Sequence, residues 1–270
     1  MAIKVGFIGT GNMGGALIKG LSGQTRRFEL VVYDINTQLT SEMSRHYPIQ
    51  VAKSVADLTS ECQVIIAAVK PKIMESVLKE CAKAMDSTKL FITVAAGLPI
   101  SFYLKNLGSS CKIVRTMPNT PALVGHGMTV ISYGENISPD EKQLVKDIFL
   151  CVGAVEELEE KLMNEVIALT GSSPAYVFMF IEAMADAAVQ SGLPRGLSYR
   201  LAAQAVMGSA RMVLETGKHP AELKDMVCSP AGTTIEAVAA LERKGFRDCV
   251  ITAMRECTQR AREIGRETNQ

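Results

Sequence analysis

The chain has 270 residues, which exceeds the usual size of one compact domain and favours two. Hydrophobic residues make up 47% of it, but aromatic residues only 5% and there is no Trp, so we expect a mainly aliphatic core. Lys and Arg number 29 against 28 for Asp and Glu, which gives no electrostatic reason to expect nucleic acid or an anionic membrane as a partner. Any anion recognition must therefore be local.

Up to about residue 160, short β-rich runs alternate with helical patterns, as in βαβ units that build a parallel sheet. The expected strands are Ile3 to Ile8, Leu30 to Tyr33, Val64 to Val69, Leu90 to Val94, Lys112 to Arg115, Met128 to Ile131 and a short one near Val155. Between the last two, Ser138-Pro139-Asp140-Glu141 predicts a helix start with a capping box. We expect residues 1–162 to form a Rossmann-type, dinucleotide-binding α/β domain.

From Met163 onward the strand pattern disappears, and residues 163–270 are expected to form an all-helical domain. Long helices are predicted from Pro174 to Ser191 and from Ser198 to Thr216, and a last helix from about Arg247. The first two are apolar around most of their circumference, which is more than one small core could hide. We therefore expect burial against a second subunit, as in a homodimer. The polar tail from Arg262 is expected to fray.

The seven cysteines are scattered and none forms a C-x-x-C pair, which argues against a disulfide framework and against zinc. His46, His126 and His219 are not spaced for a metal site, and each is expected at the surface or at a helix start. No apolar run is expected to reach membrane-spanning length, and the first strand is too short for a signal peptide. These features predict a cytoplasmic protein with no metal and no membrane partner.

The clearest motif is Gly9-Thr10-Gly11-Asn12-Met13-Gly14, which follows an expected strand and precedes an amphipathic helical run. In this setting Gly9 permits a tight turn, Gly11 lets the backbone approach a pyrophosphate, and Gly14 lets the helix pack on the strand. The helix N-terminus adds free amides and a positive dipole end. A tight glycine turn without a ligand is the alternative.

The second expected strand ends at Asp34, 20 residues past Gly14, where an acid normally accepts a hydrogen bond from a ribose 2′-hydroxyl. Such an acid would repel a 2′-phosphate, so Asp34 alone favours NAD, whereas Asn36 and Lys53 leave room for NADP. Asp34 could instead cap the following helix.

Two further turns follow strands and are expected to line the nicotinamide half of the cofactor cleft, because ligands of open α/β sheets lie beyond the carboxyl ends of the strands. They are Ala68-Val69-Lys70-Pro71 and Ala95-Ala96-Gly97. Lys70 could equally be a solvent-exposed charge.

In the helical half, the loop from Ser229 to Thr234 separates two expected helices, and Thr233 with Glu236 predicts a capping box for the second. Free amides at a helix start can hold an anion, and Thr234 adds a hydroxyl there. A small carboxylate with a neighbouring nitrogen would suit this loop. A capped helix start without a ligand is the alternative.

With these motifs the chain resembles the pyrroline-5-carboxylate reductases from end to end. The resemblance is carried by Phe7 to Gly14, Ala68 to Pro71, Met117-Pro118-Asn119-Thr120-Pro121-Ala122, Gly171-Ser172-Ser173-Pro174-Ala175-Tyr176 and Ser229 to Thr234. It implies a Rossmann domain followed by a helical domain that interlocks two subunits, with dimers often assembled into decamers. It also implies NADPH or NADH as the hydride donor to L-1-pyrroline-5-carboxylate, giving L-proline.

For the substrate site, the resemblance implies that Ser229, Gly232, Thr233 and Thr234 bind the carboxylate and that Thr234, the catalytic residue, hydrogen-bonds the ring nitrogen. Glu160 matches a position near the substrate, and Asn119 is expected with the cofactor-binding residues.

Two departures from the family pattern stand out. The loop is more often Pro-Gly-Gly, so Ala231 suits it only with φ below zero. Members of the family commonly prefer NADPH and carry no acidic residue at the position of Asp34. The preference of this chain between NADH and NADPH therefore stays open.

Two other functions share parts of this pattern. A β-hydroxyacid dehydrogenase would need a lysine on the first long helix of the second domain to handle the hydroxyl proton, and Ala175 to Ser191 contains none. A cofactor-binding protein without turnover is the other alternative.

Overall fold

The computed structural model describes residues 2–267, and the side chains of residues 2–265. The chain forms two compact units: the first runs to Ser172 and takes up the chain again at Cys257, and the second is Ser173–Glu256. This division differs from the predicted domains 1–162 and 163–270. The segment after residue 162 stays with the first unit because Met163, Ile167 and Ala168 are buried there.

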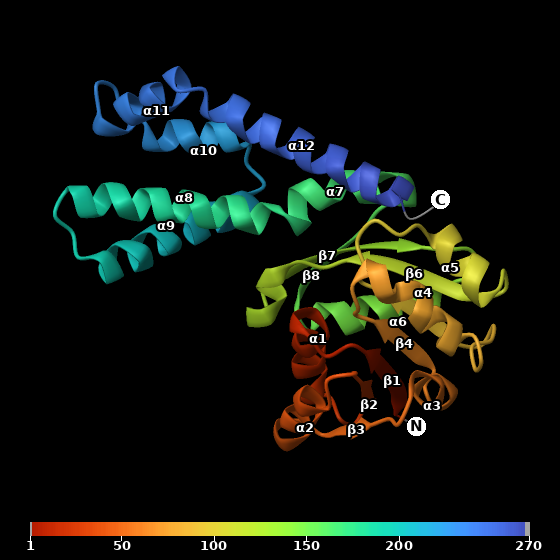
Figure 1. Ribbon diagram of the computed structural model, residues 1–270. Coiled ribbons are helices and arrows are strands. Elements are labelled where there is room, and N and C mark those ends of the chain that lie inside the picture. Colours follow the sequence, from red (N-terminus) through yellow and green to blue (C-terminus); the bar gives the residue numbers. More distant parts are fainter. Residues whose placement is uncertain (1, 268–270) are drawn as a thin grey trace. The chain divides into compact units, whose positions relative to one another are not determined.

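The first unit is built on one eight-stranded sheet with the order β3-β2-β1-β4-β5-β6-β7-β8 (Figure 1). The strands are β1 (Ile3–Ile8), β2 (Phe28–Tyr33), β3 (Ile49–Val51), β4 (Val64–Ala67), β5 (Leu90–Thr93), β6 (Lys112–Met117), β7 (Gly127–Tyr133) and β8 (Gly153–Glu157). All neighbours are parallel except β6 and β7. The short link between these two, with the 3-10 turn Thr120–Val124, allows only an antiparallel pairing. The expected strands are confirmed, while β3 was not predicted.

Helices cover both faces of this sheet, and each face has its own apolar core. On one side α1 (Asn12–Ser22) and α6 (Pro139–Leu150) pack on side chains such as Val5 and Phe7. On the other side α3 (Val55–Glu61), α4 (Pro71–Cys81) and α5 (Ile100–Leu107) pack on side chains such as Ile65 and Phe91. Helix α2 (Thr37–His46) follows β2. The strands are therefore apolar on both faces, as buried parallel strands require.

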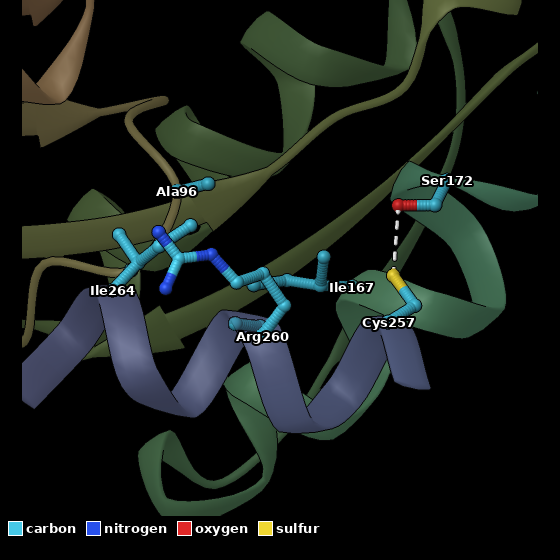
Figure 2. A pocket seen from close by; sticks show the side chains of 8 residues that line it. Ala96, Ile167, Ser172, Cys257, Arg260 and Ile264 are labelled. Atoms are coloured by element: carbon cyan, nitrogen blue, oxygen red, sulfur yellow. Dashed lines mark hydrogen bonds between the residues drawn. The ribbon is translucent and has the colours of Figure 1, made fainter. Parts of the chain in front are cut away.

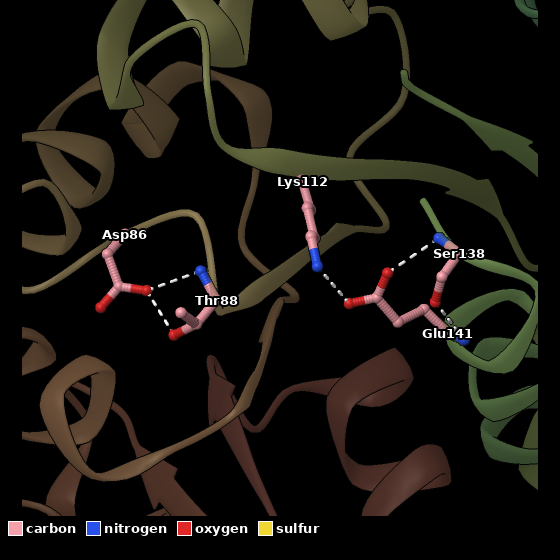
Figure 3. A network of polar contacts seen from close by, with 5 residues as sticks. All are labelled: Asp86, Thr88, Lys112, Ser138 and Glu141. Atoms are coloured by element: carbon pink, nitrogen blue, oxygen red, sulfur yellow. Dashed lines mark hydrogen bonds and ion pairs between the residues drawn. The ribbon is translucent and has the colours of Figure 1, made fainter. Parts of the chain in front are cut away.

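The predicted start of α6 is confirmed in detail (Figure 3). Ser138 Oγ accepts from the Glu141 amide at 3.3 Å, and Glu141 Oε2 accepts from the Ser138 amide at 2.9 Å. The other carboxylate oxygen accepts from Lys112 Nζ at 2.7 Å, which ties α6 to β6. Burial acts to raise the pKa of Glu141, but the hydrogen bonds from Lys112 and Ser138 outweigh it and the pKa is lowered.

The second unit contains α8 (Ser173–Gln190), α9 (Arg195–Thr216), α10 (Pro220–Val227), α11 (Thr233–Arg243) and the first part of α12 (Phe246–Glu267). Gly192 and Gly217 end α8 and α9 with φ of +95° and +62°, as the predicted breaks require. Large apolar side chains of this unit face outward: Phe178 is 62%, Met179 69% and Leu214 81% exposed. Such a surface needs a cover, which agrees with the predicted burial against a second subunit.

One stretch, Glu160–Gln190, is long and apolar enough to cross a membrane by length and composition. The expectation that no segment reaches that length is therefore wrong. The stretch is divided into α7 (Met163–Val166), a π-helical turn (Ile167–Gly171) and α8. A single such helix is weak evidence for a membrane, and only 6% of its apolar window is buried within the chain.

The end of α12 is ordered helix, not the frayed tail expected from Arg262. Ala261 and Gly265 are buried, and Arg262 forms an ion pair of 3.0 Å with Glu165. Small residues at these two positions let this end of the helix pack closely within the first unit, and this outweighs the polar composition. Residues 268–270 of the predicted tail lie outside the described part.

Candidate active site

The glycine turn between β1 and α1 has the geometry that its sequence predicts. Gly9 has φ of +95°, and a Cβ there would lie 2.6 Å from the Ala68 carbonyl oxygen. A Cβ at Gly14 would lie 2.2 Å from the Gly9 carbonyl oxygen, so only glycine lets α1 start so close to the turn. At Gly11, nothing described lies within 4 Å of the added Cβ, which leaves open space beside the helix N-terminus. First-turn amides of α1 have no partner inside the helix and can bind an anion there.

Asp34 is held against this turn from the end of β2. Its Oδ2 accepts from the Thr10 amide at 2.7 Å and from the Thr10 hydroxyl at 3.0 Å, while Oδ1 accepts from the Asn36 amide at 2.9 Å. The alternative that Asp34 caps the next helix is wrong, because Asn36 caps α2 by accepting from the Gln38 and Leu39 amides. The Asn36 side-chain oxygen is thus already engaged.

A cavity of about 260 Å³ joins the glycine turn, the end of β2 and the turn after β4. Its polar and glycine lining is Gly9, Gly11, Asp34 and Lys70. The apolar part of the lining is Ile8, Tyr33, Ile35, Ala68, Val69, Ile73 and Val77. The cavity lies beyond the carboxyl ends of parallel strands, the place where open α/β sheets bind ligands. A dinucleotide fits this chemistry: glycine-turn amides for the pyrophosphate, apolar walls for a flat ring.

Lys70 lines this cavity and is the N-cap of α4, and Pro71 occupies the first turn of that helix. The sequence offered Lys70 either as a cofactor contact or as a solvent-exposed charge. Its side chain is exposed and it lines the cavity as well. Both descriptions therefore apply.

A second cavity of about 270 Å³ lies in the same unit at the turn after β5 (Figure 2). It is lined by Ala96, Gly97, Ile167, Ser172, Cys257, Arg260, Ala261 and Ile264. Gly97 has φ of +84°, and its added Cβ would lie 3.3 Å from Ile264 Cγ2. Cys257 Sγ donates to Ser172 Oγ at 3.2 Å. Sequence reasoning found Ala96 and Gly97 but missed the α12 side chains, which belong to no motif.

Several predicted cofactor residues line neither cavity: Thr10, Asn12, Met13, Gly14, Asn36, Pro71, Ala95 and Asn119. Most of them form the backbone that shapes the turns. Asn119 has a structural task, since its Nδ2 donates to the Thr170 carbonyl at 3.0 Å and its Oδ1 accepts from the Met128 amide at 2.9 Å. Its side chain thus joins the start of β7 to the π-helical turn.

Glu160, the predicted substrate contact, lies in the first unit and has protein partners. Its Oε1 accepts from the Ile100 amide at 2.6 Å, at the start of α5, and lies 3.4 Å from Arg115 Nη1. Arg115 is 4% exposed and also donates to Asn164 Oδ1 at 2.8 Å. Burial lowers the pKa of Arg115, and the charge of Glu160 opposes this. Sequence reasoning missed Arg115, although an arginine inside an apolar strand is a signal of a paired, buried charge.

In the second unit, the loop Ser229–Thr234 differs from prediction at two points. Ala231 has φ of +55°, so the condition under which alanine suits this loop is not met and an L-residue occupies the left-handed region. Gly232, not Thr233, is the N-cap of α11 and no side chain caps the helix, so the predicted capping box is wrong.

Thr233 and Thr234 instead stand in the first turn of α11, where amides lack partners within the helix. The Gly232 amide donates to the Ser229 carbonyl at 3.0 Å, and a Cβ at Gly232 would lie 2.2 Å from Ser229 Oγ. The loop thus brings the Ser229 hydroxyl close to the start of the helix. A carboxylate could be bound by these amides and hydroxyls.

We next consider the cysteines, His219 and potential metal ligands in the described part of the chain. All seven cysteines are free thiols, and burial raises the pKa of Cys62 and Cys151 to about 12. His219 Nδ1 accepts from the Ala221 amide and caps α10, as expected for a histidine at a helix start. Over residues 2–265, no cluster of His, Cys, Asp or Glu side chains could hold a metal ion.

The parallel sheet, the glycine turn after its first strand and the cleft at the strand ends define a Rossmann-type dinucleotide-dependent oxidoreductase. Residues 4–97 match the family described as NADP oxidoreductase, coenzyme F420-dependent, and residues 160–264 match pyrroline-5-carboxylate reductase dimerisation.

The chain is 47% identical to a pyrroline-5-carboxylate reductase of Escherichia coli strain K12, over 98% of this chain and all of the relative. Among solved structures, pyrroline-5-carboxylate reductase from Coxiella burnetii is 31% identical, with a TM-score of 0.91 over 98% of this chain and 99% of that one. Pyrroline carboxylate reductase from Plasmodium falciparum with NADP bound is 35% identical, with a TM-score of 0.87 over 97% and 98%. The chain belongs to the pyrroline-5-carboxylate reductase family.

Proposed function

We propose that this protein reduces L-1-pyrroline-5-carboxylate to L-proline with a hydride from NADH or NADPH, the last step of proline biosynthesis. The observation that carries the proposal is the full-length similarity to reductases of that name. It is supported by a dinucleotide cleft in the first unit and a loop in the second unit with the chemistry to bind a carboxylate.

For the cofactor, we propose that the two turns after β1 and β4 and the turn after β5 form the binding surface, with Asp34 at the ribose. The proposed set is Gly9, Thr10, Gly11, Asn12, Met13, Gly14, Asp34, Asn36, Ala68, Val69, Lys70, Pro71, Ala95, Ala96, Gly97 and Asn119. Asn36 and Asn119 act in it by holding neighbouring backbone, since their side-chain oxygens accept from protein amides. When bound, the reduced nicotinamide supplies the hydride.

For the substrate, we propose that first-turn amides of α11 and the hydroxyls of Ser229 and Thr233 bind the carboxylate, with Gly232 leaving room. Thr234 then accepts a hydrogen bond from the protonated ring nitrogen and orients the C=N bond. Hydride addition at C5 moves the C=N π pair to nitrogen, so no protein acid is needed at the reacting carbon. Glu160 contributes by fixing the start of α5.

The test is oxidation of NADH or NADPH on addition of pyrroline-5-carboxylate, with proline identified as the product. Thr234→Ala should lower kcat/KM at least about tenfold, the loss of one good catalytic hydrogen bond. Thr234→Ser should keep most of the activity, and Thr252→Ala, on the exposed face of α12, is the matched control. Cofactor binding without oxidation would contradict the function, and unchanged kinetics of Thr234→Ala would remove Thr234 from it.

Against a β-hydroxyacid dehydrogenase, α8 carries no lysine to handle a hydroxyl proton. A panel of β-hydroxyacids with NAD or NADP is the direct comparison. Turnover of these substrates without reduction of pyrroline-5-carboxylate would favour that alternative.

The protein acts on a small molecule as a homo-oligomer, in keeping with its dimerisation region at residues 160–264. We propose a homodimer as the minimal unit, decamers as the larger assembly and the cytoplasm as its location, with no nucleic acid or membrane as partner. Light scattering on the eluting protein distinguishes two from ten chains of 29.1 kDa. A monomer at micromolar concentration would contradict the proposal, because the apolar faces of α8 and α9 would stay uncovered.

A further inference from the structure

The carboxylate of Asp34 is fixed by three protein donors, and this has a consequence for the cofactor. A carboxylate offers about four lone-pair sites. Both sites of Oδ2 are used by the amide and the hydroxyl of Thr10, and one site of Oδ1 is used by the Asn36 amide. One acceptor site therefore remains on Oδ1, and Asp34 lines the cavity.

Asp34 cannot easily turn away from a ligand. Thr10 is only 5% exposed, so water cannot readily replace Asp34 as the acceptor for its amide. A buried amide left without an acceptor destabilises the folded protein. The carboxylate is therefore held in a fixed position in the wall at the end of β2.

The two forms of the cofactor differ at the group that meets this wall. A ribose 2′-hydroxyl can donate to the open site on Oδ1. A 2′-phosphate ester instead carries a charge of about −1.5 to −2 and mainly accepts hydrogen bonds. Facing a fixed carboxylate, it is repelled and gains no donor from Asp34.

Cations near the cavity do not remove this difference. Among the described residues, Lys70 alone brings a positive charge to the lining, and it follows β4. Strand β1 lies between β4 and β2, so the two strand ends are about 10 Å apart. Lys53 follows β3, beside β2, and is exposed outside the lining, so it is the cation to test.

We propose that Asp34, locked to Thr10, makes NADH the preferred cofactor of this protein over NADPH. The inference rests on the proposed function only in taking a nicotinamide dinucleotide as the ligand of this cavity.

The experiment measures dissociation constants of NADH and NADPH with the purified protein, by the change in cofactor fluorescence, alongside kcat/KM for both. NADH should bind at least about tenfold more tightly. Asp34→Asn keeps the shape of the side chain and one acceptor for the Thr10 amide but removes the negative charge. It should reduce the ratio of the NADPH to the NADH dissociation constant about tenfold, mainly because NADPH binds more tightly. Asp57→Asn, an exposed carboxylate in the first turn of α3, is the matched control and should leave the ratio unchanged.

Equal or tighter binding of NADPH by the unmodified protein would overturn the proposal, as would failure to bind either cofactor. The proposal would also be overturned if Asp34→Asn left the ratio of the two dissociation constants unchanged. Loss of tight NADPH binding in Lys53→Met would overturn it as well, because Lys53 would then bind the 2′-phosphate. Reduction of pyrroline-5-carboxylate with either cofactor supports the proposed function whatever the ratio. If pyrroline-5-carboxylate is reduced with neither cofactor, the proposed function is wrong. The ratio of the NADH and NADPH dissociation constants then still tests the role of Asp34.

Discussion

The family resemblance implies that Glu160 lies near the substrate, whereas its contacts in the structure indicate that it stabilises the fold. Substitution of Glu160 tests which of the two roles it has. Its Oε1 accepts from the Ile100 amide at 2.6 Å and faces the buried guanidinium of Arg115 at 3.4 Å. A hydrogen bond to a charged group contributes about 1.5–3 kcal/mol, and breaking a fully buried ion pair costs about 3–5 kcal/mol. Because the Glu160 side chain is 35% exposed, solvent screening reduces these figures, and we expect about 2 kcal/mol for Glu160→Ala.

For a chain of this size, 1 kcal/mol corresponds to about 2–4 °C in Tm, so Glu160→Ala should lower Tm by about 4–8 °C. Glu160→Gln keeps an acceptor for the Ile100 amide and should lower Tm about half as much. Differential scanning calorimetry gives Tm, and steady-state kinetics gives KM for pyrroline-5-carboxylate, which should change less than about threefold.

The neighbouring Glu159 supplies the control, because its side chain is 70% exposed and pairs only with Lys161 among the contacts described. Glu159→Gln should change neither Tm nor KM. If Glu160→Gln raised KM and left Tm unchanged, Glu160 would not stabilise the start of α5. It would instead contact the substrate, as the family resemblance implies.

Three further predictions follow from local geometry. Gly14→Ala places a Cβ 2.2 Å from a backbone oxygen and should weaken cofactor binding at least about tenfold by titration, whereas Gly15→Ala, with its nearest atom at 3.5 Å, should leave binding unchanged. Ala231→Gly relieves about 1 kcal/mol of left-handed strain, partly offset by chain entropy, and should raise the unfolding free energy by about 0.5 kcal/mol in urea titrations, while a lower value contradicts the φ of +55°. Glu141→Gln should cost about 1 kcal/mol at pH 7. Because the folded-state pKa of Glu141 is lowered from 4.5, this difference is present above that pH and disappears as the pH falls through the folded-state pKa, and a difference independent of pH would contradict it.

Strong local patterns made much of the fold predictable from sequence. Buried parallel strands such as Val64–Ala67 are continuous apolar runs, and the capping box at Ser138 satisfies its own amides whatever surrounds it. Strand β3 escaped because it has only three residues, two of them exposed, at the sheet edge. Its pairing with β2 comes from its neighbour and not from its own pattern.

Parts of the site depended on contacts that no local pattern encodes. Thr10, which donates to Asp34, and Ile100, which donates to Glu160, are 24 and 60 residues away in sequence, so motif spacing could place each carboxylate but not predict these partners. In the substrate loop, the sequence suggested Thr233 as a cap, but Gly232 takes that position and carries no side chain to cap with. Spacing alone could not separate these two registers, which differ by one residue.

Helix α12 affects the order in which the molecule can be completed during synthesis. The sheet and its glycine turn are synthesised first, but the helical turns that pack beside Gly97 are made only after all of Ser173–Glu256. The nascent cofactor unit therefore waits with one wall missing while the helical unit is translated, although domains generally fold in order from the N-terminus. A fragment ending at Ser172 would contain every strand and still lack the side chains of Cys257, Arg260, Ala261 and Ile264 that close its second cavity.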